Sequence, residues 1–565
     1  MATHATIVTP APKAPAKKTA VLIASGDSRS AANLLCWPTQ KALESEIKEA
    51  FASLGWRVDR GHPEVSPQGE PHGFISSQQQ GREVFAAIHR DAPLVVAESV
   101  WQYSQHVLIG LQHHRGPILI VANWSGQWPG LVGALNLRGS LTKAGVRHSL
   151  VWAEDLKAPS FRKLVKEWTK TGRVRHDLSH VEAFVPKRAA TKPRKLGEAL
   201  AAELMRRPAI LGVFDEGCMG MFNAIVPDHL LHAAGAFKER LSQSALYYAM
   251  TQVGDGEAKA VRTWLEERGM RFATGKGDHE LTDSQIHEQC KMYIAAVRMA
   301  DEFGCDAIGI QYQLGLKDLV AASDLAEGLL NCSDRPPVVA LAGPSKGKPI
   351  RDGQPITHFN EVDECAGLDG LLTHRVWSAM GLPSDNTLHD LRWGDLDRSG
   401  TTKEFVWVFE ISGAVPPSHL EGGYAGAVSE RQPAMYFARG GGSIKGVSRP
   451  GEVVWSRIYV ADDRLHMDIG RCKAISLPRE ESERRWKSTT PAWPIMHAVL
   501  YGVSRDQMMA RHQSNHIQVV YAPDAKAADR ALAAKASMAA ALGIKVWLCG
   551  EAHNGARLAE RLGKV

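Results

Sequence analysis

Short apolar runs of β-favouring residues alternate with helical patterns along the first part of this 565-residue chain. Predicted strands at residues 21–24, 93–97 and 117–122 are separated by predicted helices near residues 40–54 and 106–113. Parallel neighbours in a sheet need long connections, which crossover helices supply. This order therefore predicts an α/β unit with parallel strands.

The same alternation returns in the middle of the chain. Predicted strands at residues 209–214, 307–311 and 337–341 accompany predicted helices over residues 230–250 and 286–303. We expect a second α/β unit here.

The pattern changes beyond about residue 385, where β-favouring runs and turns rich in glycine and proline replace helical periodicity. A β-rich C-terminal domain follows from this change. Its predicted elements are strands at residues 405–411, 453–460, 465–469, 516–521 and 544–548 and an Ala-rich helix at residues 524–541.

A basic, proline-containing stretch at residues 185–195 interrupts the first alternation and predicts a boundary. The residues before the first strand are rich in Ala, Pro, Thr and Lys and lack the long apolar stretch of a secretory signal. We therefore expect four parts: a disordered leader (1–18), an N-terminal α/β domain (19–185), a second α/β domain (186–380) and a β-rich C-terminal domain (381–565).

Composition excludes several classes of protein. Hydrophobic residues make up 44% and charged residues 23% of the chain, as in ordinary globular proteins. A net charge of +6 over 565 residues is too small for a nucleic-acid-binding surface, and the longest apolar runs are too short to cross a membrane. The eight cysteines contain no CxxC pair and no zinc spacing, which predicts reduced thiols in a cytoplasmic protein.

Acidic residues in the segment 359–364 follow an extended run and precede a helical pattern at residues 368–380. Strand alternation would place Glu361 and Asp363 on one face, at the strand end where α/β folds bind ligands. The alternative is a solvated acidic turn that caps the helix.

Two further residues have the chemistry of metal ligands. Asp390 lies in an apolar run, where an unpaired charge is costly, and an ion pair with Arg392 or another basic residue is the alternative explanation. His516 begins a strongly apolar strand, and a hydrogen-bonded structural histidine is the alternative there. Together, Glu361, Asp390 and His516 form an O/O/N set suited to Mn²⁺ or a similar divalent ion.

Two glycine-rich segments, at residues 343–348 and 439–446, raise the question of a nucleotide site. Neither has the phosphate-binding spacing of glycines after a strand and at the start of a helix. Close backbone packing or tight turns are the more common reasons for such runs.

Eight segments are spread over nearly the whole chain after the leader. They are ANWSGQWPGLVG (122–133), DEGCMGM (215–221), IVPD (225–228), DAIGIQYQ (306–313), NEVD (360–363), HDLR (389–392), YFARGGG (436–442) and SNH (514–516). In these segments and in their order, the chain resembles the L-fucose isomerase family and, more distantly, L-arabinose isomerase.

This resemblance implies two Rossmann-like α/β domains followed by a β-barrel-containing C-terminal domain, assembled as a homo-oligomer that is usually a hexamer. It implies that Glu361, Asp390 and His516 bind the metal and that Glu361 and Asp390 also transfer protons. It further implies substrate contacts, in order of decreasing similarity, from Gln311, Asn515, Trp493, Trp101 and Arg29, the last two at the rim or across a subunit contact.

The expected function is that of a metal-dependent aldose–ketose isomerase acting through an ene-diol, with Mn²⁺ as the metal and a small sugar as the substrate. This chain has Ser443 after its three glycines, where a family member has an aromatic residue, so fucose is not assumed. One alternative is an inactive sugar-binding or regulatory homologue. Another is an oxidoreductase that uses a dinucleotide, against which the missing fingerprint counts.

Overall fold

The computed structural model describes residues 12–128, 130–277, 280–343 and 346–565. The first eleven residues of the expected leader and residues 344 and 345 of a glycine-rich segment lie outside the described residues. Residues 12–18 contain no helix or strand, and the first strand begins at Thr19.

The N-terminal part is a five-stranded parallel sheet in the order β2-β1-β3-β4-β5. Helices α1 and α5 cover one face, and α2, α3 and α4 cover the other. Because both faces are buried, the strands are almost continuously apolar. The elements are β1 (Thr19–Ile23), α1 (Ser30–Ala52), β2 (Arg57–Arg60), α2 (Gln78–Ala86), β3 (Leu94–Glu98), α3 (Ser104–Leu111), β4 (Ile118–Asn123), α4 (Gly130–Lys143), β5 (Ser149–Ala153) and α5 (Pro159–Thr171).

A second parallel sheet has the order β11-β10-β7-β8. Its elements are β7 (Ala209–Phe214), α7 (Asp228–Ala233), β8 (Ala236–Leu241), α8 (Gln243–Thr251), α9 (Asp255–Glu267), α10 (Asp283–Glu302), β10 (Ala307–Ile310), α11 (Asp324–Leu330), β11 (Thr357–His358) and α12 (Glu364–Ala379).

Two predictions in this part are wrong. The helix expected over residues 230–250 is interrupted by strand β8, because Gly235 ends α7 with a φ of 77° and Ser242 caps α8. The strand expected at residues 337–341 is reduced to an isolated bridge between Val339 and Pro349.

The C-terminal part contains a closed six-stranded antiparallel barrel in the order β15-β18-β12-β13-β17-β16, closed by pairing between β15 and β16. Strands β19 and β6 extend this sheet from β16. The strands are β6 (Val181–Ala183), β12 (Asn386–Leu396), β13 (Phe405–Glu410), β15 (Gly451–Ala461), β16 (Arg464–Ala474), β17 (Ile495–Leu500), β18 (His516–Ala522) and β19 (Lys545–Cys549).

The remaining elements are short or peripheral. Strands β9 (Arg271–Phe272) and β14 (Val428–Ser429) form a small parallel pair. The other helices are α6 (Thr191–Arg206), α13 (Arg479–Lys487), α14 (Arg505–Arg511), α15 (Ala525–Ala541) and α16 (Leu558–Leu562), with 3-10 turns η1 (Pro186–Arg188), η2 (Cys218–Gly220), η3 (Phe222–Ala224), η4 (Leu316–Asp318), η5 (Asn360–Val362), η6 (Pro417–His419) and η7 (Gly423–Gly426).

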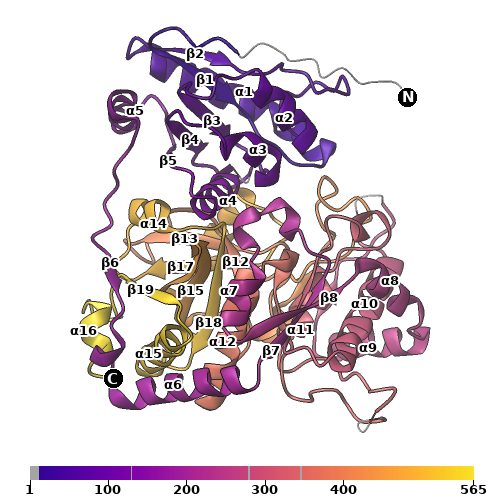
Figure 1. Cartoon of the computed structure of the whole chain (residues 1–565). Helices are drawn as coiled ribbons and strands as arrows, with labels where there is room; N and C mark the ends of the chain where they lie inside the picture. Colours follow the sequence, from indigo (N-terminus) through magenta and orange to yellow (C-terminus); the bar gives the residue numbers. More distant parts are fainter. Residues whose placement is uncertain (1–11, 129, 278–279, 344–345) are drawn as a thin grey trace, which may run out of the picture.

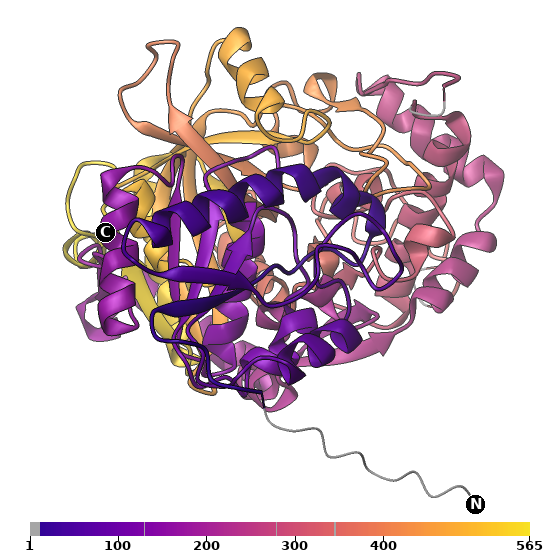
Figure 2. The same ribbon diagram turned by 90° about the horizontal axis from the view of Figure 1, so that it is seen from above.

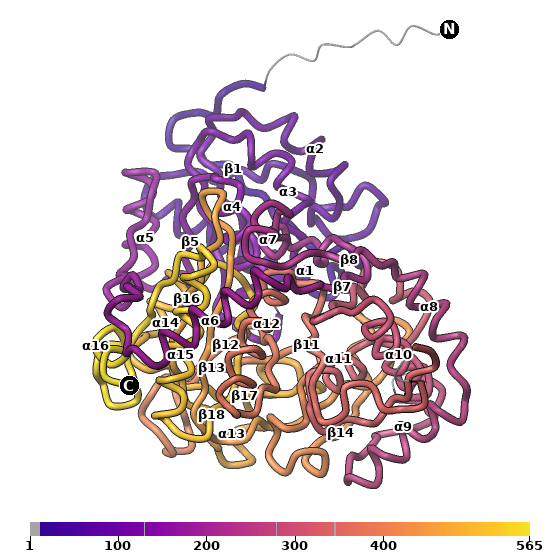
Figure 3. Tube along the Cα trace, turned by 60° about the horizontal axis from the view of Figure 1, so that its bottom comes forward, coloured from indigo at the N-terminus to yellow at the C-terminus, as the bar shows by residue number. Residues whose placement is uncertain are grey.

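The chain near the predicted boundary at residue 185 joins the C-terminal part. Strand β6 pairs with β19, and α6 packs along α15, so both lie beside the end of the chain (Figure 3). The five-stranded part lies over the rest of the molecule (Figures 1 and 2).

The molecule is thus mixed α/β, with parallel-stranded sheets and a closed six-stranded barrel near the C-terminus. The division into two Rossmann-like domains and the domain boundaries stay predictions. None of the helices in the described ranges combines the length and apolar composition needed to cross a bilayer. All eight cysteines are free and buried.

Candidate active site

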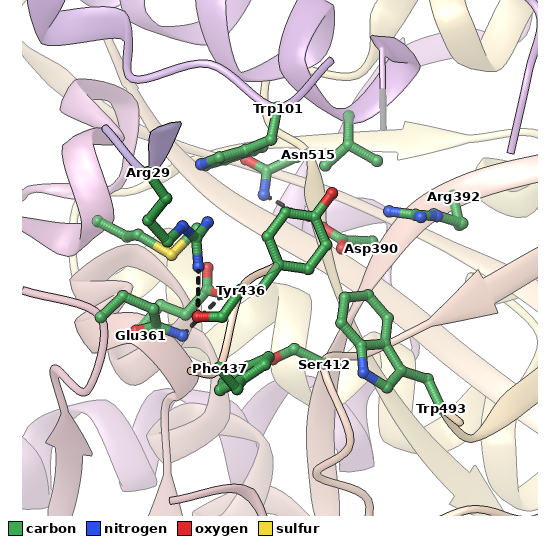
Figure 4. A pocket seen from close by; sticks show the side chains of 13 residues that line it. Arg29, Trp101, Glu361, Asp390, Arg392, Ser412, Tyr436, Phe437, Trp493 and Asn515 are labelled. Atoms are coloured by element: carbon green, nitrogen blue, oxygen red, sulfur yellow. Dashed lines mark hydrogen bonds between the residues drawn. The ribbon is translucent and has the colours of Figure 1, made fainter. Parts of the chain in front are cut away.

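A cavity lies where the three parts of the molecule meet (Figure 4). Its walls combine carboxylates, arginines and aromatic rings. They are formed by Arg29, Trp101, Val132, Met219, Gln313, Glu361, Asp390, Arg392, Ser412, Tyr436, Phe437, Trp493 and Asn515.

The carboxyl ends of both parallel sheets supply residues to this cavity. In the N-terminal sheet, Arg29 follows β1 and Trp101 follows β3, which are neighbouring strands. In the second sheet, Gln313 follows β10 and Glu361 follows β11. Loops beyond the carboxyl ends of parallel strands are where such sheets bind ligands.

The barrel brings Asp390 and His516 together. These two residues are directly opposite each other in the antiparallel pair β12–β18. Asn515, just before β18, donates from its side-chain nitrogen to Asp390 Oδ1 at 3.2 Å. His516 Nε2 lies 3.5 Å from the same Asp390 oxygen.

Glu361 reaches the same histidine from a turn with an unusual backbone. Glu361 and Val362 have φ values of 57° and 52°, which non-glycine residues rarely adopt. The Cys218 thiol of turn η2 donates to the Val362 carbonyl at 2.6 Å and holds this turn. The result places Glu361 Oε2 3.6 Å from His516 Nε2.

The predicted alternation of Glu361 and Asp363 on one face of a strand is wrong, because residues 360–362 form the 3-10 turn η5. Asp363 instead caps helix α12 and accepts from the Ala366 backbone N–H at 2.9 Å, as the alternative proposed, but the turn is buried rather than solvated. Its other oxygen lies 2.7 Å from His516 Nδ1. The helix starts at Glu364, four residues earlier than predicted.

Burial and neighbouring charges shift the acid–base groups of this cluster. The pKa of Glu361 is raised to about 7, because burial and the nearby Asp390 raise it more than His516 lowers it. Burial also raises the pKa of Asp390. Burial alone would lower the pKa of His516, but its hydrogen bond to Asp363 raises it above the ordinary value.

The chemistry of the three predicted ligands fits a divalent cation. Two carboxylates and one imidazole form an O/O/N set, and the second nitrogen of that imidazole is held by a carboxylate, as in many metal sites. In the described parts of the chain, no group of three or more His, Cys, Asp and Glu side chains is already spaced to hold a metal ion.

Asp390 makes no ion pair with Arg392; the basic side chain beside it is His516, whose Nε2 lies 3.5 Å from Asp390 Oδ1. Arg392 lies 3.3 Å from Glu410 and donates to the Gly126 carbonyl and the Thr490 hydroxyl. Arg392 therefore has a buried partner of its own. Burial raises the pKa of Glu410 to about 7, while Arg392 opposes the shift.

Four of the five predicted substrate residues line the cavity: Arg29, Trp101, Trp493 and Asn515. Arg29 and Trp101, expected at the rim or a subunit contact, reach it within one chain. Arg29 is bound to Asp27 at 2.7 Å, and its guanidinium lies over the Tyr436 ring at 4.7 Å.

Gln311, the fifth, is fully buried beside the cavity, but Gln313 lines the wall. In the orientation that satisfies its neighbours, the Gln311 amide oxygen accepts from the backbone N–H groups of Cys218 and Met219. Its nitrogen then donates to Gln313 Oε1 at 3.1 Å, and Gln313 Nε2 donates to Glu361 Oε1 at 3.4 Å.

Several wall residues received no role in the sequence analysis. Gln313, Arg392, Tyr436 and Phe437 lie within the segments that carry the family resemblance, which is the signal that could have identified them. Ser443 is outside the lining: its hydroxyl donates to the carbonyl of Ala492, next to the wall residue Trp493.

Comparison with models of protein families gives no match for this chain, and comparison with curated proteins gives no significant match.

Proposed function

We propose that this protein is a metal-dependent aldose–ketose isomerase of the fucose/arabinose type, an intramolecular oxidoreductase that acts through an ene-diol of the sugar. The observation that carries the proposal is the approach of Glu361 and Asp390 to one nitrogen of His516, at 3.6 and 3.5 Å, at the wall of a cavity. The resemblance of eight sequence segments supports the same assignment.

Glu361, Asp390 and His516 would hold the metal, with Mn²⁺ as the expected ion. When bound, such a cation polarises a sugar carbonyl and stabilises negative charge on the neighbouring oxygen. His516 contributes Nε2, and Asn515 orients the Asp390 carboxylate through its hydrogen bond.

The two carboxylates have the chemistry for proton transfer. Converting an aldose to a ketose moves one proton from C2 to C1 and one from the C2 hydroxyl to the C1 oxygen, with no net gain or loss. A carboxylate can accept and return a proton, and Glu361 lines the cavity, so we assign the carbon proton to Glu361. We assign the transfer of the proton from the C2 hydroxyl to the C1 oxygen to Asp390.

The cavity favours a neutral, hydroxylated substrate. Arg29 is paired with Asp27 and Arg392 with Glu410, so each arginine already has a carboxylate partner. The Trp101 indole N–H and the Tyr436 hydroxyl are buried and make no hydrogen bond within the described residues. Aromatic rings with such donors suit the faces and hydroxyl groups of a sugar.

The test is metal-dependent turnover. The purified protein is dialysed against a chelator, Mn²⁺ is added back, and a panel including L-fucose, D-arabinose and L-arabinose is assayed for interconversion. We expect activity only with metal, and a loss of about 10²–10⁴-fold in Glu361→Gln. The matched control is Glu83→Gln on the exposed surface of α2, which should retain full activity.

Turnover that survives complete metal removal, or an unchanged rate in Glu361→Gln, would contradict the proposed mechanism. Metal and sugar binding without conversion would favour an inactive sugar-binding homologue. The cytoplasmic location and the homo-oligomeric state stay predictions.

A further inference from the structure

A buried chain of charged groups continues behind His516. Asp363 at the start of α12, Arg457 in β15 and His516 in β18 are all at most 1% exposed. Asp363 Oδ2 accepts from Arg457 Nη1 at 2.6 Å and lies 2.7 Å from His516 Nδ1. Three separate elements therefore meet at one carboxylate oxygen.

This arrangement determines which nitrogen of His516 carries a proton. A carboxylate only accepts hydrogen bonds, so His516 Nδ1 must carry the proton of the bond to Asp363. In the neutral ring, the lone pair then belongs to Nε2. Nε2 is the nitrogen that lies 3.6 Å from Glu361 and 3.5 Å from Asp390.

We propose that Asp363 is a positioning residue that fixes the tautomer and ring orientation of His516, so that Nε2 is available to a metal, and that Arg457 holds Asp363 in place. The inference rests on the proposed function, because it takes Glu361, Asp390 and His516 as the ligand set. Hydrogen-bonded partners of metal-binding histidines typically account for 10–100-fold in metal affinity.

The two oxygens of Asp363 separate this role from helix capping. Oδ1 accepts from the Ala366 N–H, and Oδ2 contacts Arg457 and His516. In Asp363→Asn, the amide oxygen can still accept from the Ala366 N–H and cap the helix. The NH₂ group then faces His516. Nδ1 must then accept, and the proton moves to Nε2, where it blocks the ligand position.

The experiment measures Mn²⁺ binding to metal-free protein by the electron paramagnetic resonance signal of free Mn²⁺. We expect Asp363→Asn to weaken Mn²⁺ binding 10–100-fold. The matched control is Asp524→Asn, since Asp524 caps α15 through the Ala527 N–H at 2.7 Å and is exposed. This control should bind Mn²⁺ within twofold of the wild type. Nitrogen NMR of histidine-labelled, metal-free protein should show the change of the His516 tautomer in Asp363→Asn alone.

A second variant covers the case in which Asp363→Asn does not fold. Asp363→Ser with Arg457→Leu removes both charges together, which avoids a buried unpaired ion, and the serine hydroxyl can still cap α12. The same 10–100-fold loss is expected.

Wild-type Mn²⁺ affinity in a folded Asp363 variant would overturn the positioning role and leave the proposed function intact. If the chelator-treated wild-type protein binds no Mn²⁺, both the positioning role and the proposed function are overturned. This measurement on the wild type is made before any variant is compared.

Discussion

Glu98 is a fully buried carboxyl group at the carboxyl end of β3, the central strand of the N-terminal sheet. Neither of its oxygens has a hydrogen-bond partner among the described residues. Burial raises its pKa well above the ordinary value, so the folded protein holds this group in the neutral form.

The free energy of unfolding therefore depends on pH through Glu98. Below the pKa of the unfolded chain, Glu98 is protonated in both states and pH has no effect. Above it, only the unfolded state releases the proton, so stability falls by up to about 1.4 kcal/mol per pH unit until the folded pKa is reached. We expect Glu98→Gln to gain stability relative to the wild type as pH rises from 5 to 8, measured by urea unfolding. Glu83→Gln, an exposed substitution, should not show this gain, and parallel curves for Glu98→Gln and the wild type would contradict the prediction.

The two glutamines after β10 differ in role although they are two residues apart. Gln311 satisfies the backbone N–H groups of Cys218 and Met219, whereas Gln313 lines the cavity and contacts Glu361. We expect Gln311→Leu to lower the free energy of unfolding by about 1–3 kcal/mol, because buried donors lose their acceptor. Gln313→Leu should lower kcat with a smaller loss of stability. Denaturant unfolding and steady-state kinetics of both variants distinguish the roles, and the reverse pattern would restore Gln311 as the substrate contact.

At the level of elements, glycine positions show where neighbouring segments leave no room. A side chain at Gly309 in β10 would place its Cβ 2.3 Å from the ring of Phe359, which directly precedes turn η5. Gly256 in α9 has nothing within 4 Å.

We therefore expect substitution of glycine by alanine to have opposite effects on stability at these two positions. Gly309→Ala should lower the free energy of unfolding by about 1–3 kcal/mol and reduce activity, because Phe359 and the turn that carries Glu361 must move. Gly256→Ala should raise stability by about 0.5–1 kcal/mol, because alanine favours the helix. Thermal unfolding and activity assays of both variants check this, and a neutral Gly309→Ala would show that η5 tolerates displacement.

The observed helices and strands show which elements the sequence patterns could predict. Most buried parallel strands were predicted within two residues, because apolar runs bounded by turn residues are a local signal. Helix α1 begins ten residues before its predicted start, since it contains Pro38, which usually ends a helix. Turn η5 was predicted as extended, because its backbone depends on contacts with η2 that lie far away in sequence.

The candidate site is a different case. The residue types of Glu361, Asp390 and His516 and their family resemblance named them in advance. Their approach to one another depends on the pairing of β12 with β18 and the packing of η5 against η2, which no local pattern encodes. The choice between Gln311 and Gln313 depends on side-chain orientation and could not be made from the sequence either.

At the scale of the whole molecule, the proposed metal ligands come from different parts of the fold, so metal binding would connect these parts. Glu361 follows the second parallel sheet, while Asp390 and His516 belong to the barrel. A ligand that binds only the folded state stabilises it by about 2.7 kcal/mol at 100 times its Kd. We expect Mn²⁺ to raise the melting temperature of chelator-treated wild-type protein and to leave that of His516→Ala nearly unchanged, as measured by calorimetry. An equal rise in both proteins would contradict the role of His516 as a ligand.

Strand β6 has a consequence for how the chain is made. It lies between the two parallel sheets in sequence, yet its partner β19 begins about 360 residues later in the chain. At about 5–20 residues per second, the ribosome needs some tens of seconds to synthesise that partner. During this interval β6 has no partner strand and α6 has no α15 to pack against, so we expect chaperones to bind the nascent chain near residue 190.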